Sequence, residues 1–154
     1  MKDSSSGVVV HLIAQRAGQR FSLPVSSVRE VLPLPELEPV PLAPPELLGS
    51  FQLRGEIVPV VCLDSLLAIE NPETSPAVLA LLREGDATCA LAFDRVLGVV
   101  SLLPSDLLPH PLSLQRPWMA HLRLDPKHQL VTVLEGPALI GAITERLRFA
   151  AVPA

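Results

Sequence analysis

Apolar residues in this sequence occur in short segments that alternate with polar positions and end at proline, glycine or charged residues. Within residues 20–25, for example, Phe21, Leu23 and Val25 alternate with arginine, serine and proline. A period of two is typical of a half-buried β-strand. The spacing changes to three after Val25, which indicates a single turn that leads into another strand. By the same criteria we expect strands at residues 8–14, 51–53, 57–63, 78–82, 88–93, 118–124 and 129–134.

The C-terminal segment has the periodicity of a helix. Pro137 suits the first helical position, because its missing N–H would have no partner there. Apolar residues then recur every three or four positions, as on the buried face of an amphipathic helix: Leu139, Ile140, Ile143 and Leu147. We therefore predict a helix over residues 137–148 that packs back onto the N-terminal half of the fold.

Composition favours a mainly β protein with frequent turns. The chain has 17 prolines among 154 residues, roughly twice the average usage, and prolines interrupt helices. Mean hydropathy is +0.42, yet no apolar run reaches the roughly 18 residues of a membrane span. The N-terminus lacks the basic start and the long apolar segment of a signal peptide. We therefore expect a cytoplasmic protein whose residues 1–7 are disordered.

Charge and metal-binding residue types argue against several functions. The net charge is −4, and no cluster of lysines and arginines is present to neutralise nucleic-acid phosphates. The four histidines and two cysteines show no C-x-x-C, H-x-x-x-H or H-E-x-x-H spacing, so we expect neither a metal nor another cofactor. Cys62 and Cys89 lie in apolar, strand-like surroundings and are expected to be buried free thiols.

Residues 49–66 form the best-defined local unit, a predicted β-hairpin. Gly55 supplies the positive φ that a two-residue turn requires, and Arg54 beside it is displayed to solvent at the tip. Pro59 cannot donate a ladder hydrogen bond, so we expect its strand to be an edge or to bulge there. If the strands neighbour one another, Glu30 can pair with Arg54 across them. An arginine surrounded by valines and leucines is typical of a binding hot spot.

The second half of the chain repeats the first. Five apolar positions recur at one constant offset: Leu23, Val25, Val28, Val31 and Leu34 match Leu91, Phe93, Val96, Val99 and Leu102. Farther on, residues 58–60 are echoed by residues 131–133. This order indicates two copies of one small β unit. Two such units fit a pair of small closed or nearly closed barrels, because closure removes exposed strand edges.

Several short motifs around the hairpin occur in the order typical of one protein family. Gly49 to Gly55, followed by Pro59-Val60, resembles the G-x-x-N-L-R-G-x-x-x-P-V signature of CheW, the adaptor of bacterial chemosensory arrays. Three flanking segments are similar to its P-x-x-V-x-G, V-x-E-V and V-D-x-V elements: residues 44–49, 28–31 and 93–96. The match covers most of the chain.

The resemblance implies a particular version of the two-barrel fold. Two SH3-like five-stranded β-barrels would pack side by side, with a short C-terminal helix. Within one CheW-like domain over residues 8–150, the first barrel would comprise residues 8–70 plus the helix at 137–148. The second barrel would comprise residues 77–135.

The resemblance also implies the function and the partners. A CheW-like protein is a non-catalytic signalling adaptor that couples the cytoplasmic tip of a chemoreceptor to the regulatory domain of the histidine kinase CheA. It would be recruited to membrane-associated receptor arrays without inserting into the membrane. The partner-binding residues implied by the family motifs are Val28, Glu30, Val31, Gly49, Arg54, Gly55, Pro59, Val60 and Asp94.

The sequence departs from the family pattern at four positions. Gln52 replaces the usual asparagine, Cys62 an aspartate, His121 a glycine and Glu135 an aspartate. Asp64, two residues after Cys62, can take over the capping role of the missing aspartate. These departures fit a divergent adaptor of a pilus-associated or other non-flagellar chemosensory system.

Two further function classes are considered beside the adaptor. One is an SH3-like module that captures extended peptides in an unrelated complex. The other is a small hydrolase, which is disfavoured because the chain has no G-x-S-x-G motif and no serine or cysteine in a glycine-rich turn near a base.

We predict that the purified protein hydrolyses neither ATP nor ester or peptide substrates, because no nucleophile and base are paired in the sequence. Steady-state assays with each substrate class test this expectation. A reproducible turnover that disappears on replacement of Cys62, Cys89 or a histidine would contradict it.

Overall fold

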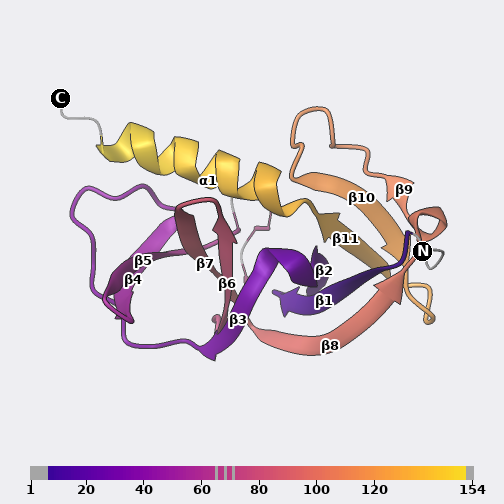
Figure 1. The fold of residues 1–154 in the computed structure, drawn as a ribbon, viewed down its shortest axis with the longest axis horizontal. Helices are drawn as coiled ribbons and strands as arrows, with labels where there is room; N and C mark the ends of the chain where they lie inside the picture. The colour runs from indigo at the N-terminus through magenta and orange to yellow at the C-terminus, as the bar shows by residue number, and fades with distance from the viewer. Residues whose placement is uncertain (1–6, 65, 68, 71, 152–154) are drawn as a thin grey trace.

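Two β-sheets and one C-terminal helix make up the structure (Figure 1). It is a computed structural model that describes residues 7–64, 66–67, 69–70 and 72–151. The expectation of a mainly β fold with a C-terminal helix is confirmed. The strands are β1 (Val9–Arg16), β2 (Gln19–Pro24), β3 (Val28–Pro33), β4 (Leu47–Leu53), β5 (Glu56–Val61), β6 (Val78–Glu84), β7 (Ala87–Phe93), β8 (Arg95–Leu102), β9 (Leu108–Pro109), β10 (Met119–Leu124) and β11 (Leu130–Leu134). The helix is α1 (Gly136–Ala151), and two short 3₁₀ turns are η1 (Val25–Ser27) and η2 (Pro104–Asp106).

Each sheet contains one outer strand that comes, along the chain, after a hairpin of the other sheet. The six-stranded sheet has the order β8-β1-β2-β11-β10-β9, and the five-stranded sheet has the order β3-β6-β7-β5-β4. The chain leaves the six-stranded sheet after β2, and β3 then pairs with β6. In the same way the chain leaves the five-stranded sheet after β7, and β8 pairs with β1. The two sheets therefore exchange one strand in each direction.

The strand registers confirm the repeat that the sequence predicted. Leu12 of β1 pairs with Val99 of β8. Ala80 of β6, 68 positions after Leu12, pairs with Val31 of β3, which is 68 positions before Val99. A β-bulge interrupts the two pairings at equivalent places. The parallel pairing of β5 with β7 is likewise matched by that of β11 with β2. The two halves are thus structural copies of one strand plan.

The sheets do not divide the chain at the expected barrel boundaries, residues 8–70 and 77–135. Strands β6 and β7 lie in the sheet of β3, β4 and β5, whereas β1 and β2 lie in the sheet of β8 to β11. Two-residue turns hold β1–β2 and β6–β7 together as local antiparallel pairs. In contrast, β3 and β8 each pair with a strand of the other local pair, so the chain crosses between the sheets before each of them. Sequence periodicity gives no indication of which copy a crossing strand joins.

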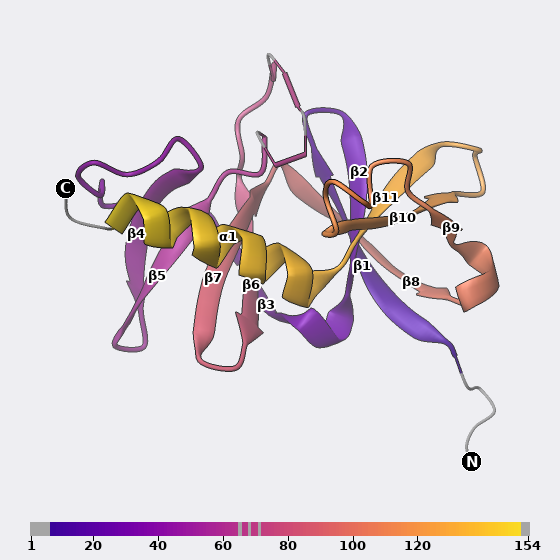
Figure 2. The ribbon, with the colours of Figure 1, turned by 90° about the horizontal axis from the view of Figure 1, so that it is seen from above.

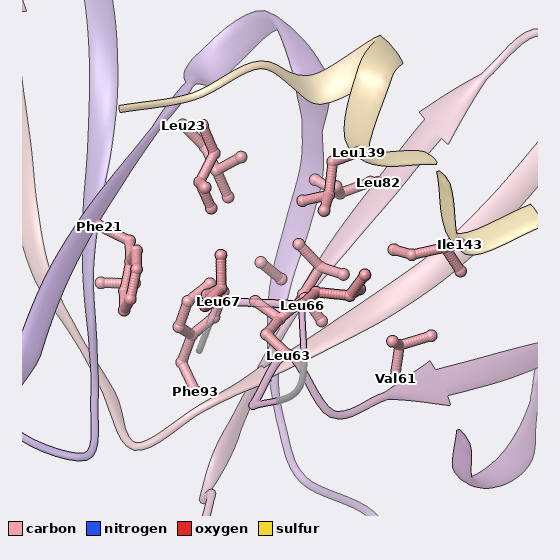
Figure 3. Close-up of a cluster of buried hydrophobic side chains, with 14 of the residues drawn as sticks. Phe21, Leu23, Val61, Leu63, Leu66, Leu67, Leu82, Phe93, Leu139 and Ile143 are labelled. Atoms are coloured by element: carbon pink, nitrogen blue, oxygen red, sulfur yellow. The ribbon is translucent and has the colours of Figure 1, made fainter. Parts of the chain in front are cut away.

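Side chains of β6 alternate between two apolar cores. Leu79 and Leu81 belong to a smaller cluster with residues of β5 and β7, whereas Ala80 and Leu82 belong to a larger one. The larger cluster brings Phe21 and Leu23 of β2 together with β5, β7, the chain after β5, and the helix (Figure 3). A strand buried on both faces needs consecutive apolar residues, which is why so much of the chain is apolar.

Helix α1 extends across the five-stranded sheet (Figure 2). It starts directly after β11, where the Glu135 carboxylate accepts a 2.7 Å hydrogen bond from the Ala138 N–H and caps the first turn. Leu139, Ile140 and Ile143 are buried in the larger core, as predicted. The helix packs on β6 and β7, two strands that we had assigned to the second barrel. The helix also shares the larger core with Phe21, Leu23 and Leu63, so its expected packing on residues 8–70 is present as well.

The predicted hairpin is formed by β4 and β5, with Arg54 and Gly55 as its two-residue turn. Arg54 has a φ of 50° and Gly55 a φ of 85°, the combination of a type I′ turn. The sequence predicted positive φ for the glycine but not for the arginine.

Pro59 led us to expect that its strand is an edge or bulges at that residue. Strand β5 instead lies between β7 and β4, and the register of the β4–β5 pair shifts between Leu47 and Gly49 rather than at Pro59. Ser50, which lies opposite Pro59, directs its backbone N–H and C=O to Glu38 instead. On the other side, β5 pairs with β7 only from Val60 onward. Pro59 therefore occupies a position where its missing N–H leaves no ladder partner unsatisfied.

Gly49 is required by a close approach between β4 and the segment before it. A Cβ at this position would lie 2.8 Å from the Glu38 carbonyl oxygen and 2.9 Å from the Leu37 Cβ, and the φ is +156°.

We predict that Gly49→Ala lowers the free energy of unfolding by about 1 kcal/mol or more, measured by chemical denaturation. Gly141→Ala is the matched control, because a Cβ there meets nothing within 4 Å and alanine favours a helix by about 0.5–1 kcal/mol. Equal effects of the two substitutions would contradict the assignment.

Candidate partner-binding site

An exposed ion pair joins strand β3 to the tip of the β4–β5 hairpin. Arg54 Nη1 donates to Glu30 Oε1 at 2.7 Å, and Nη2 donates to Oε2 at 3.3 Å. The Arg54 side chain is 70% exposed and that of Glu30 29%. The sequence suggested this pair on the condition that the two strands are neighbours. The pair is formed, although β3 is a neighbour of neither β4 nor β5 in the sheet.

The pair bridges the two edges of the five-stranded sheet, since β3 and β4 are its outer strands. Glu38 and Ser50 add a short backbone bridge between the chain after β3 and β4. The hydrogen bond from Arg54 lowers the pKa of Glu30 from its ordinary value, so the pair is charged at neutral pH. Together these contacts hold the hairpin tip against β3 and leave the arginine on the surface.

Apolar side chains lie close to this pair in the chain. Val31 is 41% exposed on β3, and Ile57 is 71% exposed on β5. Ile57 also lines a groove of about 550 Å³ with Phe51 and Glu36. Our sequence reading missed Ile57, although an isoleucine two residues after the turn falls on the opposite face from the buried Val58. Exposed apolar side chains around an arginine are the composition of a protein-binding surface.

Other residues implied by the family motifs lie inside the fold. Val60 is fully buried in the smaller core, and Val28 packs against the larger one. Gly49 is buried beneath residues 37–38, and Pro59 is half-buried in β5. The structure therefore brings Glu30, Arg54 and Gly55 together at the surface. Val31 is exposed on the other face of β3, because its strand partner Ala80 lies in the larger core whereas Leu81, the partner of Glu30, lies in the smaller one. Gly49 and Val60 are buried, and Val28 and Pro59 are half-buried.

Asp94 belongs to a buried charge cluster around Arg16, which our sequence reading missed. Arg16 is 3% exposed at the end of β1, and its Nη1 donates to Asp94 Oδ1 at 2.9 Å and to the Thr74 carbonyl oxygen at 2.8 Å. Asp94 Oδ2 accepts hydrogen bonds from the Ala17 N–H at 3.0 Å and from the Thr74 hydroxyl. A signal was present in the sequence: an arginine that ends an apolar strand has to find a carboxylate if it is buried.

Asp64 completes this cluster. Its two carboxylate oxygens accept hydrogen bonds from Arg16 Nε and Nη2, both at 2.9 Å. The sequence predicted a capping role for Asp64 and Ser65. Ser65 lies outside the described residues, and the Asp64 carboxylate is held by the Arg16 guanidinium. Three connections far apart in the chain, after β1, β5 and β7, meet at this one cation. The contacts raise the pKa of Arg16 above its ordinary value, so it stays charged.

Both cysteines are free and Cys89 is buried, as the sequence predicted, whereas Cys62 is only half-buried. Burial raises the pKa of the Cys89 thiol to about 12, and burial is also the main cause that raises the pKa of Cys62. Among the residues that the structure describes, no group of three or more His, Cys, Asp and Glu side chains is arranged to hold a metal ion. Within the same residues, no helix is both long enough and apolar enough to cross a membrane.

The fold and these contacts agree with a comparison of the sequence with known families. The sequence model described as the CheW-like domain matches residues 11–144, from β1 into α1. The chain belongs to the CheW-like domain family. The matched range includes both sheets, the hairpin and the Arg16 cluster.

Individual relatives carry related names. The CheW-like chain is 30% identical over 89 residues to the chemotaxis protein CheW of Thermotoga maritima, covering 58% of this chain and 59% of that protein. For the chemotaxis protein CheW of Rhizobium meliloti the identity is 30% over 102 residues, covering 65% and 66%. Protein FrzA of Myxococcus xanthus is 31% identical over 94 residues, covering 60% and 59%. The chain thus spans about three fifths of the length of the curated relatives it matches.

A solved structure has the same CheW-like fold. The crystal structure of the scaffolding protein TtCheW from Thermoanaerobacter tengcongensis superposes with a TM-score of 0.73, covering 82% of this chain and 84% of that one. The sequence identity is 17%, so this likeness establishes the fold alone.

Asp94 makes the CheW-like fold sensitive to acid. Burial raises its pKa, but the hydrogen bonds from Thr74, the Ala17 N–H and Arg16 together hold the pKa below the ordinary value of 3.8. Its contribution to stability is therefore complete above that value and is lost as the pH falls through the lower pKa of the folded state. We predict that Asp94→Asn lowers the free energy of unfolding by about 1–3 kcal/mol at pH 7 and by less at pH 3. Denaturation curves at both pH values test this, and an equal loss at both would contradict the linkage.

Proposed function

We propose that this protein is a signalling adaptor that couples chemoreceptors to a CheA-type histidine kinase. The observation that carries the proposal is the CheW-like match over residues 11–144, which includes both sheets. The name of two relatives, chemotaxis protein CheW, favours this function over a peptide-binding module of an unrelated complex. The partners would be the cytoplasmic tip of the receptor and the regulatory domain of the kinase.

The mechanism is scaffolding without catalysis. One molecule binds both partners through different surfaces. A change in receptor conformation alters kinase activity to the extent that the adaptor binds the two conformations with different affinities. A shared core and exchanged strands support such a role, because they make the two sheets one mechanical unit. The adaptor would act at membrane-associated receptor arrays through its partners.

The partner contact is centred on Arg54 and includes Glu30, Val31 and Gly55, with Ile57 as a further member. These residues share the hairpin tip and the adjoining part of β3. Gly49 and Val60 are buried and Val28 and Pro59 half-buried, so these four support the fold rather than the partner contact, and Asp94 belongs to the separate cluster around Arg16. A cation held by one exposed carboxylate and surrounded by apolar groups can exchange that carboxylate for one on a partner at little cost.

Replacement of Arg54 tests the site directly. Because Arg54 already has a positive φ, alanine brings no new backbone requirement, and we predict that Arg54→Ala leaves the melting temperature almost unchanged. Loss of a central hot-spot arginine should weaken binding of a kinase regulatory-domain fragment or a receptor-tip fragment about thirtyfold. Isothermal titration calorimetry with each fragment measures this.

Two further variants separate a lost contact from a lost fold. Arg95→Ala removes an exposed arginine from the six-stranded sheet and should leave both affinities unchanged. Gly55→Val places a β-branched residue at a φ of 85° and should lower the melting temperature as well as the affinity. If folded Arg54→Ala binds both fragments with wild-type affinity, Arg54 is not part of the interface.

A further inference from the structure

A pocket of about 250 Å³ lies between β8, an outer strand of the six-stranded sheet, and the β10–β11 turn, and residues of β1, β2 and β11 also line it. Its apolar wall includes Leu97 and Val99 of β8, which are 38% and 66% exposed. Its polar wall contains three cationic side chains and one carboxylate: Arg20, Arg123, Lys127 and Asp125. None of these residues takes part in the site at Arg54.

Arg123 is the residue that distinguishes this pocket. It is 7% exposed, and within the described part of the chain its buried Nε has no hydrogen-bond partner. Its neighbour His11 does not compensate the charge: burial and then Arg123 lower the pKa of His11 from its ordinary value. A guanidinium removed from water is normally paired with an anion, because burial removes the hydration that stabilises it.

The carboxylate in the pocket is already occupied by other donors. Asp125 Oδ2 accepts a hydrogen bond from Arg20 Nη1 at 2.9 Å. Asp125 Oδ1 accepts hydrogen bonds from the backbone N–H groups of Lys127 and Gln129, at 2.8 and 2.9 Å. Asp125 therefore balances one positive charge of the three and supplies no hydrogen bond to Arg123.

The internal repeat shows what the pocket lacks. In the five-stranded sheet, Glu30 lies opposite Leu81 and bridges to the hairpin turn through Arg54. In the six-stranded sheet, the same place in the register, opposite Ile13, is occupied by Gly98. The turn that corresponds to Arg54 is the β10–β11 turn, because β5 and β11 make equivalent parallel pairs. The second copy thus keeps cations at the turn but has no side chain to place a carboxylate there.

We propose that this pocket binds a carboxylate carried by a partner polypeptide, a glutamate or aspartate side chain. Arg123 would donate to the carboxylate, Lys127 would add positive charge, and Leu97 and Val99 would contact the adjoining apolar part of the partner. A carboxylate fits better than a phosphate because the equivalent place in the other sheet is filled by one, and because one wall of the pocket is apolar. The partner's carboxylate would thus form between two chains the kind of ion pair that Glu30 forms with Arg54 within this chain. The proposal does not depend on the receptor–kinase function.

The first experiment introduces the carboxylate into the chain itself. Leu97→Glu places it at the pocket wall, and Leu97→Gln is the uncharged control of the same size. Leu97→Glu should have a higher melting temperature than Leu97→Gln, and Arg123→Met should abolish that difference. Equal melting temperatures of the two Leu97 variants with Arg123 present would overturn the proposal.

The second experiment supplies the carboxylate from outside. Acetyl-Val-Glu-Val-amide and its Val-Gln-Val counterpart are titrated into the ¹⁵N-labelled full chain at constant ionic strength, with sodium phosphate and sodium acetate as separate arms. The glutamate peptide should shift the Arg123 Nε–H and Gly98 amide resonances in a saturable way and bind at least about tenfold more tightly than the glutamine peptide. It should also bind more tightly than either small anion. Equal shifts with the glutamine peptide, or tighter binding of phosphate or acetate, would reject a polypeptide carboxylate as the ligand.

A control addresses the fold of the variant. Arg123→Met removes a buried guanidinium whose Nε has no hydrogen-bond partner among the described residues, and should not lower the melting temperature. The peptide titration of the unaltered chain needs no substitution at Arg123, so it decides the question even if that variant does not fold.

Discussion

The exchange of strands between the two sheets is the constraint on which the rest of the structure depends. β3 completes the five-stranded sheet and β8 the six-stranded one, although each follows directly on a strand of the other sheet. Removing either half of the chain would leave the remaining sheet with an unpaired edge and an open core. The larger apolar cluster, which contains residues of both sheets and of α1, follows from this arrangement. We conclude that the two sheets fold and move as one body.

Arg16 reinforces that body electrostatically. Its guanidinium holds carboxylates that follow β5 and β7, and the latter lies at the point where the chain crosses between sheets. A buried arginine with both carboxylates in place is satisfied, whereas loss of one partner leaves a desolvated charge. This makes the crossing connection rigid. An adaptor that transmits a conformational difference between two partners benefits from such rigidity, because little of the difference is absorbed within the adaptor.

The two copies of the strand plan have become chemically different at one equivalent place. In the five-stranded sheet, Glu30 and Arg54 close the gap between the outer strand and the hairpin turn. In the six-stranded sheet, Gly98 stands where the glutamate would be, and the buried Nε of Arg123 has no hydrogen-bond partner among the described residues. A repeat that keeps its backbone register while its side chains diverge can present two different surfaces on one rigid frame. This suits a protein that holds two partners.

The sequence by itself determined the local elements: the strands, the hairpin turn at Arg54-Gly55, the C-terminal helix and the repeat. These follow from side-chain periodicity and turn chemistry, which act over a few residues. Only the tertiary structure decided which copy β3 and β8 join, because either arrangement buries the same apolar positions. It also decided that Asp94 and Gly49 support the fold from within, and that Arg16 meets Asp64 and Asp94. Those roles depend on contacts between segments far apart in the chain, and no local pattern specifies them.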